Sequence, residues 1–557
     1  MSKVIIIGGV AGGASAAARL RRLDETAQIL ILERGEHVSY ANCGLPYYVG
    51  GVIEDRAELL LHTPESLKER YNIDVRTLSE VIAIEPERKV VRVQGPEGEP
   101  YEEGYDKLII ATGSSPLRPP IRGIDSPRIR TLWTVGDAEM IHDLAADPAL
   151  RSVAVIGGGF IGVEMAENLR HRGLDVSLVE MLDQVLTPLD YEMALPLHQR
   201  MEAEGIRLHL DDGVDSFHDT GDAVTVTLKS GTEISAQLVI LAIGVRPNSE
   251  LARAAGLEIG PRGGIITDDH MLTSDPDIYA VGDAVQVKDR VFGDGAMIPL
   301  AGPANKQGRI AADNIAGLDS RYEGTLGSGV VQVFDMTAAF TGANEKALIK
   351  RGLTRGKDYE RLIICQLDHA GYFPGAQQMN IKLLFAQDGS RIFGAQIVGR
   401  GGVDKRLDVL ATAIRLGASV RDLAQLELSY APPYSSAKDP VNMAGFMAGN
   451  ILDGKAEFSE WDVMEKHPLS QVVDVREDYE VAEFALPRAI HIPMGQLRER
   501  VDELDPGKET IVVCAWGTRA HNAARTLQNL GFRDVQIYPG GTGFYQMTHA
   551  STAPVAR

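Results

Sequence analysis

Two cysteines stand at positions where a sulfur atom could do chemistry. Cys43 lies in SYANCGLPYYVGG, residues 39–51, and no second cysteine lies within ten positions of it. The others are Cys365 and Cys514, and three cysteines so far apart cannot form a disulfide framework, which favours a reducing compartment. What Cys43 does therefore depends on the elements that position it.

The surroundings of Cys514 point to sulfur chemistry of a second kind. Cys514 follows an apolar run in IVVCAWGTRAHNAARTLQNLGF and begins a six-residue turn that opens an alanine-rich helix. Backbone N–H groups at the start of a helix stabilise an anionic sulfur. Cys365, in contrast, lies in the alternating pattern RLIICQLD, which predicts a core strand. No His/Cys cluster has the spacing of a metal site, so we expect none.

Charge and composition narrow the choice of partners. The 557 residues carry a formal charge of −21, which argues against nucleic acid or an anionic membrane as a partner. Any anionic ligand must therefore meet a local basic cluster. The apolar run in MSKVIIIGG is too short for a signal peptide, and no later run reaches the roughly 18 apolar residues of a membrane span. We expect a cytoplasmic multidomain protein that acts on small molecules.

A strand, a glycine turn and an alanine-rich helix follow one another twice, at residues 3–23 and 152–173. Each helix is followed by a second apolar strand that ends in an acid, Glu33 in the first copy and Glu180 in the second. This order is that of a βαβ unit for binding a nucleotide. The apolar strand before VGDA, residues 281–284, returns to the first copy, so the second unit is predicted to be inserted in the first.

The glycines of the second copy complete the nucleotide fingerprint. Gly157, Gly159 and Gly162 satisfy G-x-G-x-x-G, and the helix that they open offers its N-terminal amides to a pyrophosphate. In the first copy Gly8 and Gly13 fit, but Val10 replaces the middle glycine. Glycines in such turns also serve close helix–strand packing, so the first copy alone leaves both interpretations open.

Together with ATG at 111–113 and VGDA at 281–284, the two units resemble the pyridine nucleotide–disulfide oxidoreductase family over about residues 1–450. In that family the first unit holds FAD and the inserted unit holds NAD(P)H. The resemblance implies FAD contacts at Gly8, Gly13, Glu33, Thr112, Gly113 and Asp283, and nicotinamide-cofactor contacts at Gly157, Gly159, Gly162 and Glu180. Because a carboxylate at Glu180 would repel a 2′-phosphate, NADH is favoured over NADPH.

The same resemblance gives Cys43 a role. Disulfide reductases of this family usually carry two cysteines four residues apart, so here the second sulfur must come from elsewhere. A lone cysteine beside the flavin forms a mixed disulfide with a small thiol, or cycles through sulfenic acid as in NADH oxidases and peroxidases. A buried structural cysteine is the third alternative. The stretch around Cys43 resembles the coenzyme A (CoA) disulfide reductase branch, with asparagine before the cysteine and Leu-Pro-Tyr after the glycine.

The helix after the first glycine turn supports that branch. Ser15, Arg19 and Arg22 lie at i, i+4 and i+7, on one helical face, and bring two guanidinium groups to a basic site in an acidic protein. The phosphates of CoA need such partners. In the resembling reductases these positions, with Ser39 and Asn42, bind CoA. The alternative is an arginine face that is only solvated.

Proton delivery to a leaving thiolate calls for a nearby acid. Tyr372 in AGYFPGA and Tyr430 in SYAPPYSSAKDP match two tyrosines that the resembling family projects from the partner subunit, and Lys438 matches a CoA contact. The resemblance thus implies a homodimer whose active sites are completed across the interface. The alternative is that tyrosines before prolines serve as structural turns.

The last hundred residues resemble a single rhodanese domain, the sulfurtransferase module. The resemblance rests on VVDVRE, with Asp474 and Arg476, and on the loop C-x-x-G-x-R from Cys514 to Arg519. It implies that Cys514 carries a persulfide and that Arg519 belongs to the catalytic loop. The stretch EFALPRAIHIPM departs from the usual Gly-His-Ile pattern, which weakens inference about the substrate but not about the fold.

These observations predict an α/β protein with two Rossmann-like dinucleotide-binding domains, an α+β dimerisation domain and an α/β rhodanese domain. The expected boundaries are 1–117 with 246–325 for FAD, 118–245 for NAD(P)H, 326–450 for dimerisation, 451–460 for a linker and 461–557 for the rhodanese domain.

The expected activity is NADH-dependent reduction of CoA disulfide, CoA persulfide or polysulfide through Cys43, coupled to persulfide chemistry at Cys514 and releasing sulfide. An NADH peroxidase or oxidase with a sulfenic acid at Cys43 is the alternative enzyme. A redox-sensing scaffold that docks a partner through its rhodanese domain is the non-enzymatic alternative.

Overall fold

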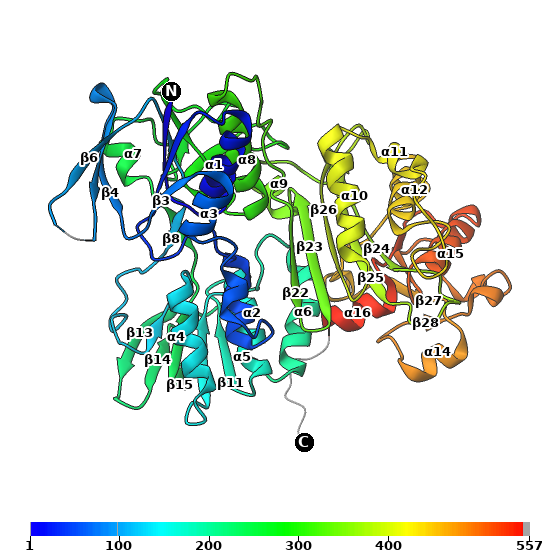
Figure 1. The fold of residues 1–557 in the computed structure, drawn as a ribbon. Coiled ribbons are helices and arrows are strands. Elements are labelled where there is room, and N and C mark those ends of the chain that lie inside the picture. Colours follow the sequence, from blue (N-terminus) through cyan, green and yellow to red (C-terminus); the bar gives the residue numbers. More distant parts are fainter. Residues whose placement is uncertain (1, 97, 550–557) are drawn as a thin grey trace. The chain divides into compact units, whose positions relative to one another are not determined.

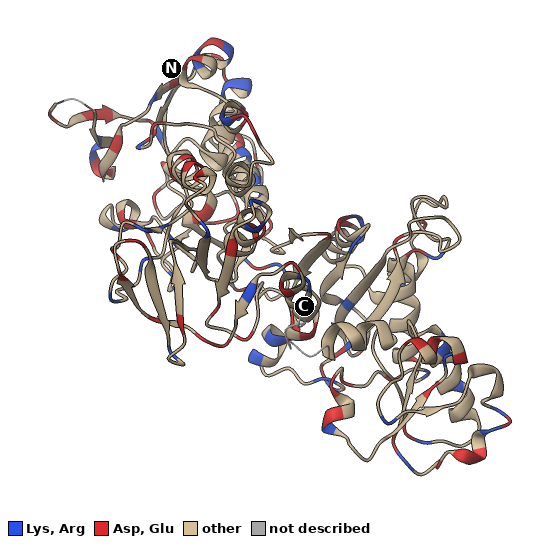
Figure 2. Ribbon diagram, turned by 90° about the horizontal axis from the view of Figure 1, so that it is seen from below, with Lys and Arg blue, Asp and Glu red and all other residues tan. Residues whose placement is uncertain are grey.

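The computed structural model describes residues 2–96 and 98–549, which divide into two compact units (Figure 1). Unit 1 contains the residues up to Asp183 and Gly205–Gly327, and unit 2 contains Gln184–Glu204 and the chain from Ser328 onward. Acidic and basic residues are interspersed along the helices and loops of each unit (Figure 2). None of the described helices is both long and apolar enough to cross a membrane.

Unit 1 is built on two five-stranded parallel sheets. The first has the order β19-β7-β1-β2-β3, with β1 (Lys3–Ile7), β2 (Gln28–Leu32), β3 (Asp74–Arg76), β7 (Lys107–Ile110) and β19 (Ile278–Ala280). The second has the order β12-β11-β10-β16-β9, with β9 (Ile129–Arg130), β10 (Ser152–Ile156), β11 (Asp175–Val179), β12 (Arg207–His209) and β16 (Leu238–Leu241). Because β7 and β19 pair in the first sheet while the chain between them forms the second, the predicted insertion is confirmed.

Helices and small sheets complete unit 1. The smaller sheets are β4 (Glu80–Glu85) with β5 (Val90–Gln94) and β6 (Tyr101–Gly104), β13 (Val214–Asp219) with β14 (Val224–Leu228) and β15 (Glu233–Ala236), β8 (Ser114–Pro116) with β17 (Val245–Pro247), and β18 (Ile265–Ile266) with β20 (Val285–Lys288) and β21 (Gly295–Ala296). The α-helices are α1 (Ala11–Leu23), α2 (Leu45–Gly50), α3 (Pro64–Tyr71), α4 (Val135–Ala146), α5 (Phe160–His171), α7 (Glu250–Ala254) and α8 (Ala301–Ile315). Helices α1 and α8 cross where a Cβ on Gly308 would lie 2.2 Å from the Gly12 carbonyl oxygen, so the glycine allows the close approach.

Unit 2 begins with a five-stranded antiparallel sheet. Its order is β22-β23-β26-β25-β24, with β22 (Gly329–Val333), β23 (Met336–Gly342), β24 (Tyr359–Leu367), β25 (Gln378–Ala386) and β26 (Ile392–Gly399). Around it lie α6 (Tyr191–Ala203), α9 (Glu345–Lys350), α10 (Val403–Leu416), α11 (Val420–Gln425) and α12 (Pro440–Leu452). Helices α10 and α12 pack on the sheet and bury an apolar face against it (Figure 1). Cys365 is 2% exposed in β24, which confirms the predicted core strand.

The last part of unit 2, predicted to be a rhodanese domain, is a four-stranded parallel sheet flanked by helices. The order is β28-β27-β29-β30, with β27 (Gln471–Asp474), β28 (Ile490–His491), β29 (Thr510–Val513) and β30 (Val535–Ile537). Its helices are α13 (Val463–Lys466), α14 (Asp478–Glu483), α15 (Thr518–Asn529) and α16 (Gly541–His549).

The segment expected to be a linker is packed into the fold. Ala456 and Phe458 are buried, and Phe458 forms a parallel bridge with Ile537 at the edge of β30. The Arg355 guanidinium donates to the Phe458 carbonyl oxygen at 2.6 Å. The polar composition of the segment masks this alternating apolar pair, whose burial ties the segment to the sheet that contains β30.

A fully buried lysine ties α6 to the antiparallel sheet of unit 2. The Lys382 ammonium lies 2.5 Å from Glu192, 2.7 Å from Glu345 and 2.9 Å from Asp190, and the residue is 0% exposed. The Arg361 guanidinium, also buried, donates to Glu345 at 2.7 Å. The Lys382 and Arg361 charges offset the burial of the Glu345 carboxyl and lower its pKa to about 2. Removing one partner from such a buried group costs about 3–5 kcal/mol.

Candidate functional site

The first glycine turn is fixed by close packing. Gly8 has φ +97°, and a Cβ on it would lie 2.3 Å from the Ala111 carbonyl oxygen. A Cβ on Gly13 would lie 1.9 Å from the Gly8 carbonyl oxygen. Both glycines are therefore required for α1 to start against the ends of β1 and β7.

The second turn repeats this geometry and adds an open position. A Cβ on Gly162 would lie 1.8 Å from the Gly157 carbonyl oxygen, whereas a Cβ on Gly159 would meet nothing within 4 Å. Packing therefore does not require Gly159, although a ligand that approaches the backbone closely would. The equivalent position of the first unit is Val10, the N-cap of α1, so a side chain is accommodated there.

The acids at the ends of β2 and β11 occupy equivalent places. The Glu33 carboxylate accepts from the amides of Gly9 at 2.9 Å and Gly35 at 2.8 Å. The Glu180 carboxylate accepts from the amides of Gly158 at 2.6 Å and Leu182 at 2.9 Å. Each carboxylate thus lies beside a glycine turn, where the ribose of a nucleotide bound to that turn would be.

The remaining residues expected to contact FAD gather at the ends of β7 and β19. Gly113 has φ +63°, and a Cβ on it would meet nothing within 4 Å. The Thr112 hydroxyl donates to the Asn248 carbonyl oxygen at 2.6 Å, and the Ser114 hydroxyl donates to the Asp283 carboxylate at 2.8 Å. Burial raises the pKa of Asp283. The open backbone at Gly113 and the Asp283 carboxylate beside it fit a polar ligand such as the flavin chain.

Cys43 lies in a short 3-10 turn, Asn42–Gly44, between β2 and α2, and its side chain is exposed. Nearby protein atoms still remove enough water that desolvation is the largest cause of a raised thiol pKa, followed by the charges of Glu164 and Asp283. The loop is anchored by Ser39, whose amide donates to the Gly9 carbonyl oxygen at 2.8 Å and whose φ is +50°. The loop that carries Cys43 is therefore tied to the first glycine turn.

The face of α1 expected to bind CoA is partly engaged by α8. The Ser15 hydroxyl donates to the Asn305 side chain, and the Arg19 guanidinium donates to the Asp313 carboxylate at 2.6 Å. Arg22 is exposed, as is Asn42. Arg22 is thus the member of the predicted arginine pair that presents its side chain to solvent.

An arginine on α8 escaped the sequence analysis. Arg309 lies four residues after Asn305 and four before Asp313, so it follows the same row of α8, and it is exposed. The i, i+4 spacing along α8 was the signal that would have drawn attention to it.

In unit 2 the structure brings the two predicted tyrosines together. The hydroxyl groups of Tyr372 and Tyr430 lie 2.6 Å apart, although the residues are 58 positions apart in sequence. Their exposed fractions are 76% and 46%, and the hydrogen bond from Tyr372 raises the pKa of Tyr430. Lys438 is exposed in the same connecting segment before α12. Two exposed phenols sharing a hydrogen bond are the arrangement expected of a proton donor for a ligand outside this unit.

Cys514 follows β29 directly and is 2% exposed. The Gly517 amide donates to its sulfur at 3.0 Å, and Gly517, with φ +107°, is the N-cap of α15. The turn is closed from the other side by Thr542, whose amide donates to the Cys514 carbonyl oxygen at 2.8 Å. The sulfur thus lies at the N-terminal end of a helix, as predicted.

Two arginines flank the Cys514 turn, each with a carboxylate. Arg519 donates to both carboxylate oxygens of Glu480, at 2.5 and 2.6 Å, and that contact raises its pKa. Arg476 is held by Asp474, at 2.6 Å, and by the Phe484 carbonyl oxygen, at 2.7 Å. Arg519 is the arginine whose charge acts on the Cys514 sulfur, whereas Arg476 is buried and holds the C-terminal end of α14 through the Phe484 carbonyl oxygen.

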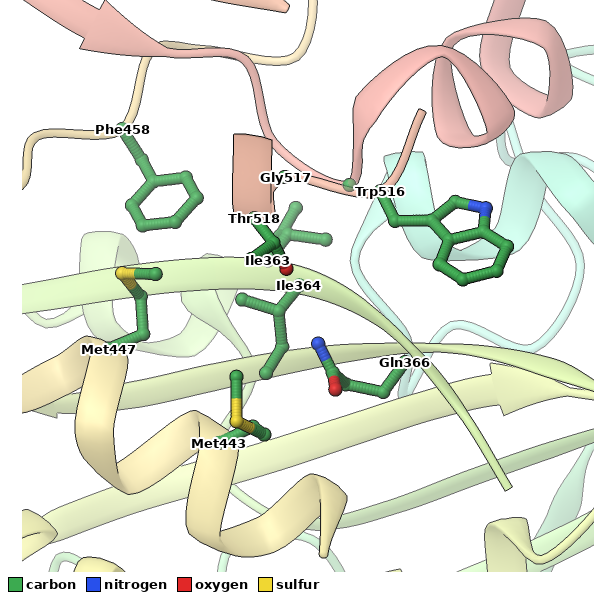
Figure 3. Close-up of a pocket in the computed structure, with 10 residues that line it drawn as sticks. Ile363, Ile364, Gln366, Met443, Met447, Phe458, Trp516, Gly517 and Thr518 are labelled. Atoms are coloured by element: carbon green, nitrogen blue, oxygen red, sulfur yellow. The ribbon is translucent and has the colours of Figure 1, made fainter. Parts of the chain in front are cut away.

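A small pocket with a largely apolar lining adjoins the Cys514 turn (Figure 3). On one side lie Trp516, Gly517 and Thr518 from the turn. The other side is formed by β24 and α12, with Met443 and Met447 pointing into it. The turn that carries Cys514 therefore borders an apolar surface of the antiparallel sheet.

Metal-ligating side chains meet at one place among residues 2–96 and 98–549. Asp268, Asp269 and His270 place their ligand atoms within 4.8 Å of one another. His270 lies 3.0 Å from Asp269 and 2.8 Å from Asp319, so these side chains already satisfy one another.

Comparison with known proteins assigns each part of the chain. The model of the pyridine nucleotide-disulphide oxidoreductase family matches residues 2–308, that of its dimerisation domain matches 329–440, and that of the rhodanese-like domain matches 460–546. Coenzyme A disulfide reductase from Staphylococcus epidermidis is 36% identical over 450 residues, which cover 80% of this chain and 100% of that protein.

Solved structures extend the similarity over both modules. Reduced CoADR-RHD from Bacillus anthracis is 47% identical with a TM-score of 0.94, covering 98% of each chain. A NAD-dependent persulfide reductase from A. fulgidus is 39% identical with a TM-score of 0.93, covering 98% of this chain and 100% of that one. A water-forming NADH oxidase from Lactobacillus brevis is 29% identical with a TM-score of 0.78, covering 82% of this chain and 99% of that one.

Proposed function

The chain belongs to the pyridine nucleotide-disulphide oxidoreductase family, and from this premise we propose that it reduces CoA disulfide or CoA persulfide with NADH and carries sulfur on Cys514. The observation that carries the proposal is the position of Cys43, exposed and without a second cysteine, in the same unit as two nucleotide turns. Such a thiol can form a mixed disulfide with a sulfur that the substrate brings. The relative named for CoA disulfide reduction is similar over 450 residues, and the structures of CoADR-RHD and of a persulfide reductase are similar over 98% of the chain.

The two glycine turns fit the FAD and NAD(H) on which this family depends. The turn at Gly8 and Gly13, with Glu33 and Asp283, would hold FAD, and the turn at Gly159 with Glu180 would hold NADH. When bound, FAD would pass two electrons from NADH to a disulfide at Cys43.

The chain's own residues supply the sulfur exchange. The Cys43 thiolate attacks one sulfur of CoA disulfide, forming a Cys43–CoA mixed disulfide and expelling a CoA thiolate. Two electrons then return Cys43 and the second CoA to thiols, so each disulfide consumes one NADH and one proton and gives two CoA thiols. For CoA persulfide the same two electrons give one CoA thiol and one sulfide.

Substrate binding would draw on the CoA-binding positions of α1 and the Cys43 loop. The exposed side chain of Arg22 is available to bind a phosphate of CoA, and Ser15 and Arg19 lie on the same face of α1. We infer that Lys438 and the Tyr372–Tyr430 pair act on the Cys43 site of the partner subunit in a homodimer. The exposure of both tyrosines and the presence of the dimerisation domain support this assignment.

The rhodanese module would load sulfur for the reductase. The Cys514 thiolate takes the outer sulfur of thiosulfate and releases sulfite, leaving a persulfide that the Gly517 amide and Arg519 stabilise. Transfer of that sulfur to a CoA thiol gives CoA persulfide and regenerates Cys514. We place the enzyme in the cytoplasm, where both thiols stay reduced.

The deciding experiment compares NADH oxidation by the holoenzyme with CoA disulfide, CoA persulfide, polysulfide and hydrogen peroxide, together with oxygen consumption. We expect kcat/KM to be highest for the CoA substrates. Preference for peroxide or oxygen would instead assign a sulfenic acid at Cys43, the chemistry of an NADH peroxidase or oxidase. No turnover with any acceptor would identify a redox-sensing scaffold.

A further inference from the structure

A buried arginine on α10 contacts both segments that carry the exposed tyrosines of unit 2. Arg406 is 1% exposed, and α10 packs on strands β23 and β26 of the antiparallel sheet. The backbone comes so close to the guanidinium that a Cβ on Gly402, whose φ is +61°, would lie 2.2 Å from the Arg406 Nη1 atom. The glycine therefore leaves the room that the guanidinium occupies.

The Arg406 guanidinium joins the two segments through one of its nitrogen atoms. The Nη2 atom lies 2.7 Å from the carbonyl oxygen of Asp368, which precedes Tyr372 by four residues on the connection between β24 and β25. The same atom lies 3.1 Å from the Ser435 hydroxyl oxygen and 3.0 Å from the Asp439 carboxylate, on the segment between α11 and α12. The protons of Nη2 are thus shared between the two segments.

The first segment forms a loop whose base is closed at the Arg406 contact. The Asp368 amide donates to the Gln377 carbonyl oxygen at 2.9 Å, and the Gln377 amide donates to the Asp368 carboxylate at 2.7 Å. Tyr372 lies between these two residues and is exposed. Because the base of the loop is closed, its position determines where Tyr372 lies.

The second segment is held where α12 begins. The Asp439 carboxylate accepts from the Ser435 hydroxyl at 2.7 Å and from a backbone amide in the first turn of α12 at 2.9 Å, so it caps that helix as well as binding Arg406. Both side chains are buried, whereas Tyr430 and Lys438 of the same segment are exposed. The buried part of each segment is therefore the part that Arg406 binds.

We propose that Arg406 is a positioning residue for disulfide reduction. By joining the two segments at their buried ends, it keeps the Tyr372 and Tyr430 hydroxyls at the 2.6 Å over which they share a hydrogen bond. The proposal rests on the role proposed above for this pair, which is to give a proton to the thiolate that leaves at the Cys43 site of the partner subunit. Arg406 acts through the tyrosines and does not touch the substrate.

The contact between the two phenols matters because the leaving CoA thiolate takes up one proton. One phenol gives that proton, which forms CoA thiol and leaves a phenolate. The hydroxyl of the other phenol stabilises the phenolate by donating a hydrogen bond to it, and a proton from water restores the phenol before the next cycle. If the segments move apart, the phenolate loses its donor and proton transfer slows.

The test measures kcat for CoA disulfide with NADH on the holoenzyme and combines two variants in a double-mutant cycle. Arg406→Met removes the guanidinium but keeps an unbranched side chain, and Tyr430→Phe removes one hydroxyl. The matched control is Arg355→Met, because Arg355 also lies in unit 2 but donates to the Phe458 carbonyl oxygen instead of to the tyrosine segments. Flavin reduction by NADH, thiosulfate sulfurtransferase activity and thermal melting are followed on the same preparations.

We expect kcat to fall about 10- to 100-fold in Tyr430→Phe and at least about 5-fold in Arg406→Met, because both changes impair the same proton transfer. In the double variant kcat should lie within about 2-fold of that in Tyr430→Phe alone, because the shared hydrogen bond is already lost. Flavin reduction and sulfurtransferase activity should stay near the wild-type values. Arg355→Met should keep the wild-type kcat for CoA disulfide.

Three outcomes would overturn the proposal. The first is an unchanged kcat in Arg406→Met. The second is a loss from Arg406→Met that is equally large with and without the Tyr430 hydroxyl, which would show that Arg406 acts independently of the tyrosines. The third is an equal loss of disulfide reduction and sulfurtransferase activity, which would make Arg406 a residue that only stabilises unit 2.

If Arg406→Met does not fold, Ser435→Ala decides the matter, because it removes one acceptor of the guanidinium and leaves the ion pair with Asp439. We expect a fall in kcat of about 2- to 5-fold that disappears in the Tyr430→Phe background, and an unchanged kcat would overturn the proposal. Failure of the proposed function is distinguishable, because the wild-type enzyme would then not reduce CoA disulfide or Tyr430→Phe would match the wild type.

Discussion

The two reactive thiols of this protein lie in opposite electrostatic surroundings. Cys43 is exposed, and carboxylates act on it, whereas Cys514 is 2% exposed, accepts a hydrogen bond from the Gly517 amide and faces the charge of Arg519. A thiol whose pKa is raised by desolvation and by the charges of Glu164 and Asp283 suits a thiolate that is formed and consumed in each cycle. A site of amide and guanidinium donors suits an anionic sulfur that is stored.

Exchanging each cysteine for serine gives the sharpest test of this division. Cys43→Ser should lower NADH-driven reduction of CoA disulfide by more than about 1000-fold, because serine cannot form the mixed disulfide, while FAD binding and flavin reduction by NADH persist. Cys514→Ser should abolish thiosulfate sulfurtransferase activity and leave reduction of CoA disulfide nearly intact. Both activities and FAD content are measured on the same preparations. If either variant lost both activities with FAD bound, the two roles would not be separate.

The next largest effect should come from the exposed arginine of α1. Arg22→Ala should raise KM for CoA disulfide by about 10- to 100-fold and leave KM for inorganic polysulfide nearly unchanged, since a charge-assisted contact is worth about 1.5–3 kcal/mol. Arg253→Ala, which removes an exposed arginine from α7, is the matched control. Equal effects of Arg22→Ala on both acceptors would show that the α1 face is only solvated.

A change at Glu180 should alter the preference between NADH and NADPH as electron donor. It should not affect the chemistry at Cys514. Glu180→Gln keeps an oxygen acceptor but removes the charge that repels a 2′-phosphate, so the preference for NADH over NADPH should narrow by about 10-fold. Steady-state kinetics with both nucleotides measure the ratio, and sulfurtransferase activity should not change. An unchanged ratio would mean that Glu180 does not face the ribose.

The smallest effect is expected beside Cys514. Glu480→Gln weakens the two-oxygen contact that orients Arg519, so sulfurtransferase activity should fall by about 3- to 10-fold while CoA disulfide reduction is unaffected. A parallel fall in both activities would point to a general loss of stability, which thermal melting detects. No change would show that Arg519 is positioned without its carboxylate partner.

Much of the candidate site could be predicted from the sequence, because many of its residues lie close together in short stretches of the chain. The glycine turns and Cys514 at the start of α15 each depend on neighbours within about six residues, and the structure places them as predicted. The family and the order of the domains follow from the same short patterns. The roles of the individual CoA-binding residues stay predictions.

Features that depend on distant parts of the chain could not be predicted. The pairing of Arg19 with Asp313 joins residues 294 positions apart, and helical spacing alone gave no reason to separate Arg19 from Arg22. Composition also misrepresented the segment before the rhodanese sheet, since Phe458 turned out to be buried.

The buried Lys382 defines what a functional piece of this protein must contain. Two of its three carboxylate partners, Asp190 and Glu192, come from a segment that lies almost 200 residues earlier in the chain, between two strands of a nucleotide-binding sheet. A gene fragment beginning at Ser328 would include the entire antiparallel sheet and rhodanese module, yet it would leave this ammonium with Glu345 alone. Cutting the chain at the sequence boundary before Ser328 would therefore separate Lys382 from two of the carboxylates that neutralise it inside unit 2.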